Sequence, residues 1–207
     1  MLPSDHSPMT GYEESIAFYH ELGVAVSAWA NVERALVWIV TSCFSEQDQE
    51  SSALMFLSIE NFRSKTQVAD NLFRTKFDGT AHIESWNELS QRTERLSQLR
   101  NHLVHYHTMG YSDGKPGRRL ALIPTLSRKP KFRQKLPKPP SGSLCLRDIV
   151  SARLQFTALA FGLEFLVHRV NQQKTLLPAS LAQADDAPSM AKLTHQIRTM
   201  LSQPLSP

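Results

Sequence analysis

Cysteine is scarce in this chain, and long apolar runs are missing. The 207 residues include two cysteines, Cys43 and Cys145, and no Cys-x-x-Cys pair, which excludes a zinc ribbon. Both cysteines have apolar neighbours, so we expect two buried free thiols in a reducing compartment. The most apolar stretch, residues 158–167, contains Glu164 and is too short to cross a bilayer. No membrane partner is therefore expected.

A secretory signal is also missing from the first ten residues. The segment MLPSDHSPMT has neither a positively charged region nor an apolar core. We therefore expect a cytoplasmic protein. A length of 207 residues and an apolar fraction of 41% suit one domain with a sizeable core.

The net charge of +4 conceals a strong asymmetry. Ten Lys or Arg and no acidic residue lie between Gly114 and Arg147. Since the chain has 23 basic and 19 acidic residues, the remainder holds 13 basic and 19 acidic residues, a balance of −6. A mildly acidic body therefore carries one strongly basic segment.

The first predicted helix spans Gly11 to Phe44, with apolar residues at helical spacing on two sides. We expect one side to face its own bundle and the other to face a second subunit. The first stripe is Phe18, Leu22, Ala25, Trp29, Val32, Leu36, Ile39 and Cys43, and the second is Ile16, Tyr19, Gly23, Val26, Ala30, Glu33, Val37, Val40 and Phe44.

Three further helices are predicted, over Ser51 to Phe77, Ala81 to His107 and Leu146 to Gln173. Met109 and Gly110 are expected to end the second of these. The apolar seam of that helix has 3-4-3-4-3 spacing and consists of Trp86, Leu89, Thr93, Leu96, Arg100 and Leu103.

The predicted fold is all-α, an antiparallel four-helix bundle with a basic, Pro-rich insert at 112–145 before the last long helix. Within the insert, 119–126 suits a short strand or hairpin, which Pro124 would confine to a sheet edge. Residues 127–143 suit an extended loop. The helical domain covers 11–175, between a tail at 1–10 and a mostly polar tail at 176–207, in which residues 191–201 suit a short helix.

Chemistry-bearing residues gather in the segment from Leu99 to His107. Arg100 lies on the apolar seam, where an unpaired charge is costly, so it requires an anionic partner or a wet cleft. Glu33 is the one acid on either stripe of the first helix, and we expect a contact between the two. That contact is equally compatible with a purely structural ion pair.

Three histidines, His102, His105 and His107, allow more than one interpretation. A metal site is disfavoured because no acidic residue follows until Asp113 and the spacing matches no standard zinc pattern. Neither a metal nor a cofactor is expected. Surface histidines at a helix end and general acid–base chemistry both remain open. Asn101 and His105, four residues apart, share a helix face.

The stretch Arg100-Asn101-x-x-x-His105 resembles the signature of the HEPN superfamily. The resemblance covers about residues 11–175 and includes Trp29 with Glu33 one turn later. It implies a metal-independent endoribonuclease that works as a homodimer, with the two Arg/His motifs meeting in an interface cleft. His105 would be the acid–base residue, Arg100 would stabilise the transition state, and Asn101 would orient His105 or the phosphate.

The resemblance also implies accessory roles and partners. Glu33 would position Arg100, while His102 lies within the motif and Tyr106 directly follows it, both as accessory residues. Toxin members often carry Tyr two residues after the motif His, whereas His107 stands there in this chain. A role as a toxin or antiphage effector, restrained by a cognate antitoxin protein, follows from the same resemblance.

The basic insert is interpreted as an arm that contacts RNA phosphates beside the motif, or as a plain solvated linker. The alternative function is a non-catalytic HEPN-like helical module that binds RNA or a protein. The residues expected to contact RNA are Arg118, Arg119, Arg128, Lys129, Lys131 and Arg133.

Overall fold

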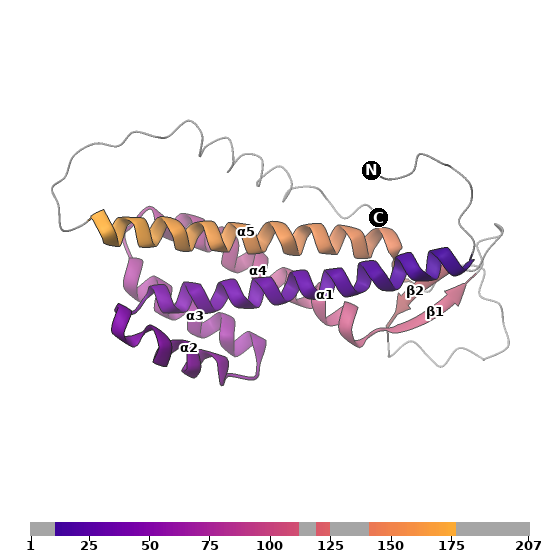
Figure 1. The fold of residues 1–207 in the computed structure, drawn as a ribbon, viewed down its shortest axis with the longest axis horizontal. Coiled ribbons are helices and arrows are strands. Elements are labelled where there is room, and N and C mark those ends of the chain that lie inside the picture. Colours follow the sequence, from indigo (N-terminus) through magenta and orange to yellow (C-terminus); the bar gives the residue numbers. More distant parts are fainter. Residues whose placement is uncertain (1–10, 112–118, 125–140, 177–207) are drawn as a thin grey trace, which may run out of the picture. The chain divides into compact units, whose positions relative to one another are not determined.

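A computed structural model describes residues 11–111, 119–124 and 141–176 of the chain. These residues form five α-helices, one 3₁₀ turn and a small antiparallel sheet inserted before the last long helix (Figure 1). The mostly helical fold predicted from the sequence is confirmed. The helices and the turn are α1 (Gly11–Ser42), η1 (Glu46–Asp48), α2 (Gln49–Leu57), α3 (Phe62–Phe77), α4 (His82–His105) and α5 (Leu146–Leu176).

Contacts divide the chain into two compact units. The first unit comprises residues 1–27 and 99–153, and the second comprises residues 28–98 and 154–207. The boundary falls within three long helices, so each unit contains one part of α1, α4 and α5.

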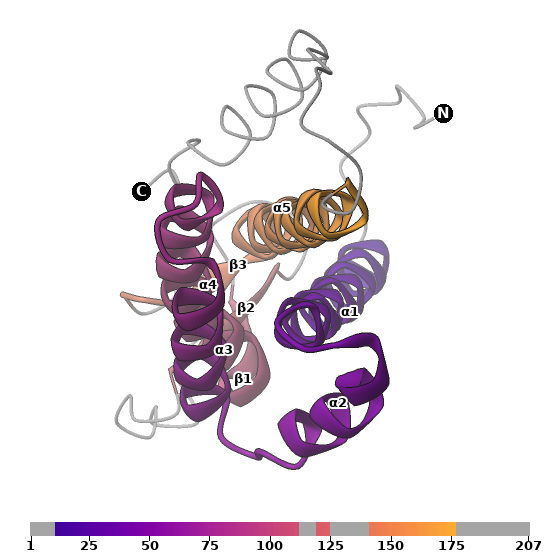
Figure 2. The same ribbon diagram turned by 90° about the vertical axis from the view of Figure 1, so that its left-hand side faces the viewer.

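The second unit is built around aromatic contacts between four helices. The ring of Trp29 on α1 lies 5.0 Å from Phe62 on α3 and 5.0 Å from Phe156 on α5, measured between centroids. Phe73 on α3 stacks on Trp86 of α4 at 4.9 Å. Figure 2 shows α2 beside the second half of α1, outside these contacts. Aromatic rings bury large apolar areas, so these contacts help to hold the unit together.

The first unit joins the start of α1 and the start of α5 to the sheet. Its strands are β1 (His107–Tyr111), β2 (Arg119–Ile123) and β3 (Leu144–Cys145), in the order β1-β2-β3 and antiparallel throughout. An ion pair of 2.8 Å joins Arg153 Nε on α5 to Glu21 Oε2 on α1. The core residues of this unit are Phe18, Ala25, Leu103, Ala121, Leu122, Ile123, Ile149 and Ala152.

The two sides of α1 differ in exposure. Phe18, Ala25 and Val32 are fully buried, as the first predicted stripe requires. On the second stripe, Ile16 and Tyr19 are 53% and 55% exposed. One side of α1 therefore faces the protein interior, as predicted, while the N-terminal half of the other side faces solvent.

The predicted helix over 51–77 is wrong as a single element. The chain leaves the helix at Ser58 and begins α3 at Phe62, after the N-cap Asn61. The Asn61 side chain accepts hydrogen bonds from the backbone N–H groups of Arg63 and Ser64, at 2.9 and 3.3 Å. This cap satisfies donors that a new helix leaves open, which favours the break.

Two expectations for the chain after α4 are also wrong. The helix ends at His105, before the predicted last residue His107, and Met109 and Gly110 belong to β1 instead of terminating the helix. The strand at 119–123 is the central one, because β1 and β3 pair with its two sides. Pro124 does not confine it to an edge, since it follows the last residue of β2.

Two helices, over Tyr12–Ser42 and Leu146–Gln172, are long and apolar enough to cross a membrane by length and composition. The buried shares of their apolar windows are 44% and 56%. Buried core helices of soluble proteins pass the same criteria, so this is weak evidence for a membrane span.

Candidate functional site

The candidate site begins on the last turns of α4. Of the predicted seam, Trp86, Leu89, Thr93, Leu96 and Leu103 are buried, and Arg100 is half-buried among them. The buried seam residues fix the rotation of the helix, because turning it would expose them. Arg100 is thereby held at the margin of the core, with Asn101 on the exposed side.

Arg100 and Asn101 interact directly through their side chains. Arg100 Nη1 donates a hydrogen bond to Asn101 Oδ1 at 3.2 Å. A guanidinium carries five N–H donors in a flat fork, so one bond to an amide oxygen does not exhaust its donors. The planar fork matches the oxygen pairs of a phosphate group.

His105 is the last residue of α4, and its side chain is exposed. It lies four residues after Asn101, which places both side chains on one face of the helix. An imidazole at a solvent-facing helix end is accessible to a ligand, and imidazole is the side chain that general acid–base catalysis uses most often. Position and chemistry at His105 are therefore compatible with acid–base work.

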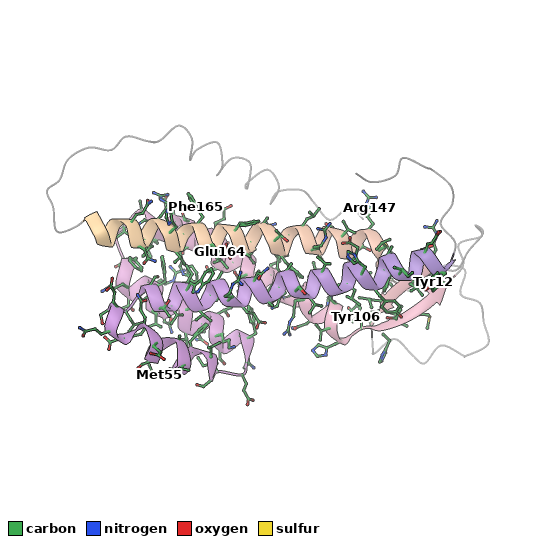
Figure 3. The ribbon with its side chains drawn as sticks, in the orientation of Figure 1. Tyr12, Met55, Tyr106, Arg147, Glu164 and Phe165 are labelled. Carbon is green, nitrogen blue, oxygen red and sulfur yellow. The ribbon has the colours of Figure 1, made fainter. Side chains whose placement is uncertain are left out.

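The turn that follows His105 is held by His102 and Tyr106. Their rings stack with a centroid distance of 4.6 Å and an interplanar angle of 18°. The Tyr106 backbone N–H donates to the His102 carbonyl at 3.0 Å, which continues the helical pattern for one more residue. The pair thus positions the point where the chain leaves α4 and enters β1 (Figure 3 labels Tyr106).

The register of the sheet determines where Arg119 lies. His107 pairs with Ile123 at one end of the hairpin, whereas Tyr111 pairs with Arg119 at the other. Four residues of strand extend about 13 Å, so Arg119 is separated from His107 by that length of sheet. Arg118, Arg128, Lys129, Lys131 and Arg133 lie outside the described residues.

Glu33 belongs to the second unit, where its carboxylate has an identified partner. Glu33 Oε1 accepts a hydrogen bond of 2.7 Å from Trp29 Nε1, one turn earlier on α1. The contact orients the indole that packs against Phe62 and Phe156. This is a structural role that the sequence analysis did not anticipate, and the expected contact between Glu33 and Arg100 stays a prediction.

Arg92, which the sequence analysis passed over, is a buried cation in the second unit. Its side chain lies on α4 and the residue is 8% exposed. Burial lowers the pKa of the guanidinium to about 10, the charge of Arg95 lowers it further, and Glu88 opposes the shift. The group remains charged at neutral pH. The sequence could have indicated that Arg92 is buried, because it directly precedes Thr93 of the apolar seam.

The cysteines are both free thiols, as predicted, although Cys145 is only half-buried. Burial raises the pKa of the Cys145 thiol, and Asp148 raises it further through a side-chain hydrogen bond. A raised pKa leaves less thiolate at neutral pH, so this cysteine is a poor nucleophile. Asp148 also has a structural role: its Oδ2 accepts a hydrogen bond of 2.8 Å from the Cys145 backbone N–H, which caps the start of α5.

Among residues 11–111, 119–124 and 141–176, no group of three or more His, Cys, Asp or Glu side chains could hold a metal ion. The end of α4 carries a guanidinium hydrogen-bonded to an amide, Arg100 with Asn101, and an imidazole stacked on a phenol ring, His102 with Tyr106. Such groups bind anions and transfer protons.

No protein-family model, curated protein or solved structure matches this chain.

Proposed function

We propose that the protein is a metal-independent endoribonuclease of HEPN type. The observation that carries the proposal is the motif at the end of α4, where Arg100 and Asn101 are hydrogen-bonded and exposed His105 follows one turn after Asn101. The position of these residues at a solvent-facing helix end supports it, because a polymeric substrate requires an accessible site.

In the proposed reaction, His105 removes the proton from a ribose 2′-hydroxyl, whose oxygen attacks the adjacent phosphorus. The bond from phosphorus to the 5′-oxygen breaks, and that oxygen takes a proton from the His105 imidazolium, which returns the imidazole to its neutral form. The products are a 2′,3′-cyclic phosphate and a 5′-hydroxyl. Arg100 stabilises the extra negative charge of the transition state, and Asn101 holds Arg100 in place.

The proposed active form is a homodimer. Support comes from the N-terminal half of α1, where four large apolar residues face solvent: Tyr12, Ile16, Tyr19 and Val26 are 76%, 53%, 55% and 42% exposed. An apolar stripe of this kind is typical of a subunit interface. The double substitution Ile16→Asp and Tyr19→Asp should convert a dimer to a monomer in sedimentation velocity, and a monomeric wild-type protein at micromolar concentration would contradict the proposal.

The decisive experiment is RNA cleavage in the presence of excess EDTA. We expect His105→Ala to lower the cleavage rate by about 10²–10⁴-fold, the range of general acid–base catalysis. The matched control is His107→Ala, an exposed imidazole at the start of β1, which should retain activity. Full activity in the His105 variant would refute the assignment of that residue.

A non-catalytic binding module is the second candidate. The ten Lys or Arg without an acid between Gly114 and Arg147 favour it, because phosphate binding requires charge but no proton transfer. In that case RNA remains intact in the assay, and binding weakens steeply with salt.

A cytoplasmic role as a toxin or antiphage effector belongs to the same proposal, together with an antitoxin protein that restrains it. Expression of the wild-type chain should then arrest bacterial growth, whereas the His105→Ala chain should not. Equal growth of both strains would refute the toxin role, whereas the proposed RNA cleavage would still be decided by the cleavage assay.

A further inference from the structure

The outer face of α2 carries an apolar patch, which we call the α2 patch. It consists of Leu54, Met55 and Leu57, which are 63%, 62% and 56% exposed. Figure 3 places Met55 at the outer edge of α2, away from α1. Phe56, between them in sequence, is 3% exposed and anchors the helix from its inner side. The patch is therefore a fixed surface on a packed element.

Exposed acidic residues flank the α2 patch along the chain, while Lys65 of α3 lies with its Nζ 6.0 Å from the centroid of the Phe56 ring. Glu46, Asp48, Glu50 and Glu60 are all exposed, and residues 45–61 contain no Lys or Arg. Within the part of the chain that the structure describes, none of these four carboxylates forms an ion pair. Glu50 lies on the same side of α2 as Leu54 and Leu57, since residues four and seven apart align on a helix. The surface thus suits a segment that is apolar on one side and basic on the other.

A segment of that kind is present in the C-terminal tail. In residues 189–201, Met190, Leu193, Ile197 and Met200 recur with 3-4-3 spacing, and Leu201 extends the same stripe. Lys192 and Arg198 fall outside this stripe, and the segment has no acid. Its apolar side matches the α2 patch, and its charges match the acidic rim.

The chain between α5 and this segment is long enough to reach. Twelve residues, 177–188, follow the end of α5 at Leu176. An extended chain of that length spans about 40 Å at most. The end of α5 and α2 belong to the same compact unit and lie toward the same end of it in Figure 1. The basic insert is a weaker match, because four prolines between residues 127 and 143 interrupt any helical spacing.

We infer that residues 189–201 dock on the α2 patch of their own chain as an amphipathic helix. Met190, Leu193 and Ile197 cover Leu54, Met55 and Leu57. Lys192 and Arg198 face the acidic rim. The inference uses neither Arg100 nor His105, so it stands apart from the proposed ribonuclease activity.

Photo-cross-linking in the full-length chain tests this docking. A benzoylphenylalanine at position 55 should link to residues 189–201, identified by mass spectrometry in a product of monomer mass. The matched control carries the same probe at position 161, where Phe161 on α5 is 60% exposed. We expect about tenfold more linkage from position 55, since a tethered segment has a millimolar effective concentration at its site.

Mixing with an isotope-labelled chain distinguishes the source of the linked segment. Linkage to the labelled chain would overturn the inference in favour of a second copy. Linkage to another segment, or equal yields from positions 55 and 161, would overturn docking itself.

Charge reversal provides the second measurement. Lys192→Glu with Arg198→Glu should lower the position-55 yield about tenfold, because like charges then face each other across the contact. Adding Glu46→Lys with Glu50→Lys should restore the yield. A yield that does not change with either pair would overturn the proposed pairing of the tail with the acidic rim.

Discussion

The two ends of α4 use polar side chains in different ways. Near its start, Trp86 is 1% exposed, stacks on Phe73, and donates from Nε1 to Asp70 Oδ1 at 2.9 Å. At its last turn, Asn101 and His105 are exposed. At the first end, Asp70 provides the hydrogen-bond acceptor that the buried indole N–H of Trp86 requires. Asn101 and His105 are exposed, so burial does not require them for stability. They are therefore the better candidates for function.

The first end should therefore carry the larger energetic cost of mutation. Trp86→Ala removes a fully buried aromatic ring and its stacking partner for Phe73, and we expect a loss of about 3–5 kcal/mol in the free energy of unfolding. Urea denaturation followed by circular dichroism measures it. The control is Trp38→Ala, because Trp38 is 41% exposed. Similar losses for both tryptophans would contradict the burial described for α4.

The helical framework could be predicted from the sequence because apolar periodicity reports burial directly. The predicted starts of α1 and α5 agree with the structure, and the two sides of α1 were separated correctly in its N-terminal half. The break at Ser58 was missed because Ile59 and Phe62 continue the apolar pattern across it. Asn61, a residue type that often caps helix N-termini, could have indicated that a new helix begins at Phe62.

The candidate site was predictable in position but not in geometry. Spacing alone indicated that Arg100 and His105 lie near the end of a bundle helix. It could not reveal the hydrogen bond between Arg100 and Asn101, which depends on rotamers. The placement of Arg119 at the far end of the hairpin depends on strand register, which nonlocal pairing determines.

Asp70 tests whether the polar contact at the first end matters in addition to the ring. Its carboxylate accepts from Trp86 and also pairs with Arg74, whose Nε lies 2.9 Å from Oδ2. That hydrogen bond raises the pKa of the Arg74 guanidinium. Asp70→Ala leaves the indole N–H without its acceptor, and we expect a loss of about 1–3 kcal/mol in unfolding free energy.

The control for Asp70 is Arg74→Gln, which removes the exposed ion pair and keeps the bond to Trp86. It should cost about 0.5 kcal/mol or less, because exposed ion pairs contribute little. The same urea titration measures both variants. An equal loss in the two would mean that the ion pair, rather than the buried indole, accounts for the effect of Asp70.

The smallest effect on stability is expected at the last turn of α4. His105→Ala and Asn101→Ala should each change the free energy of unfolding by no more than about 0.5 kcal/mol, as is usual for exposed side chains. Thermal melts of the purified variants measure this. A loss as large as that of Asp70→Ala would show that the last turn is structurally required, and the contrast between the two ends would fail. Retained stability with lost cleavage would instead separate folding from chemistry along one helix.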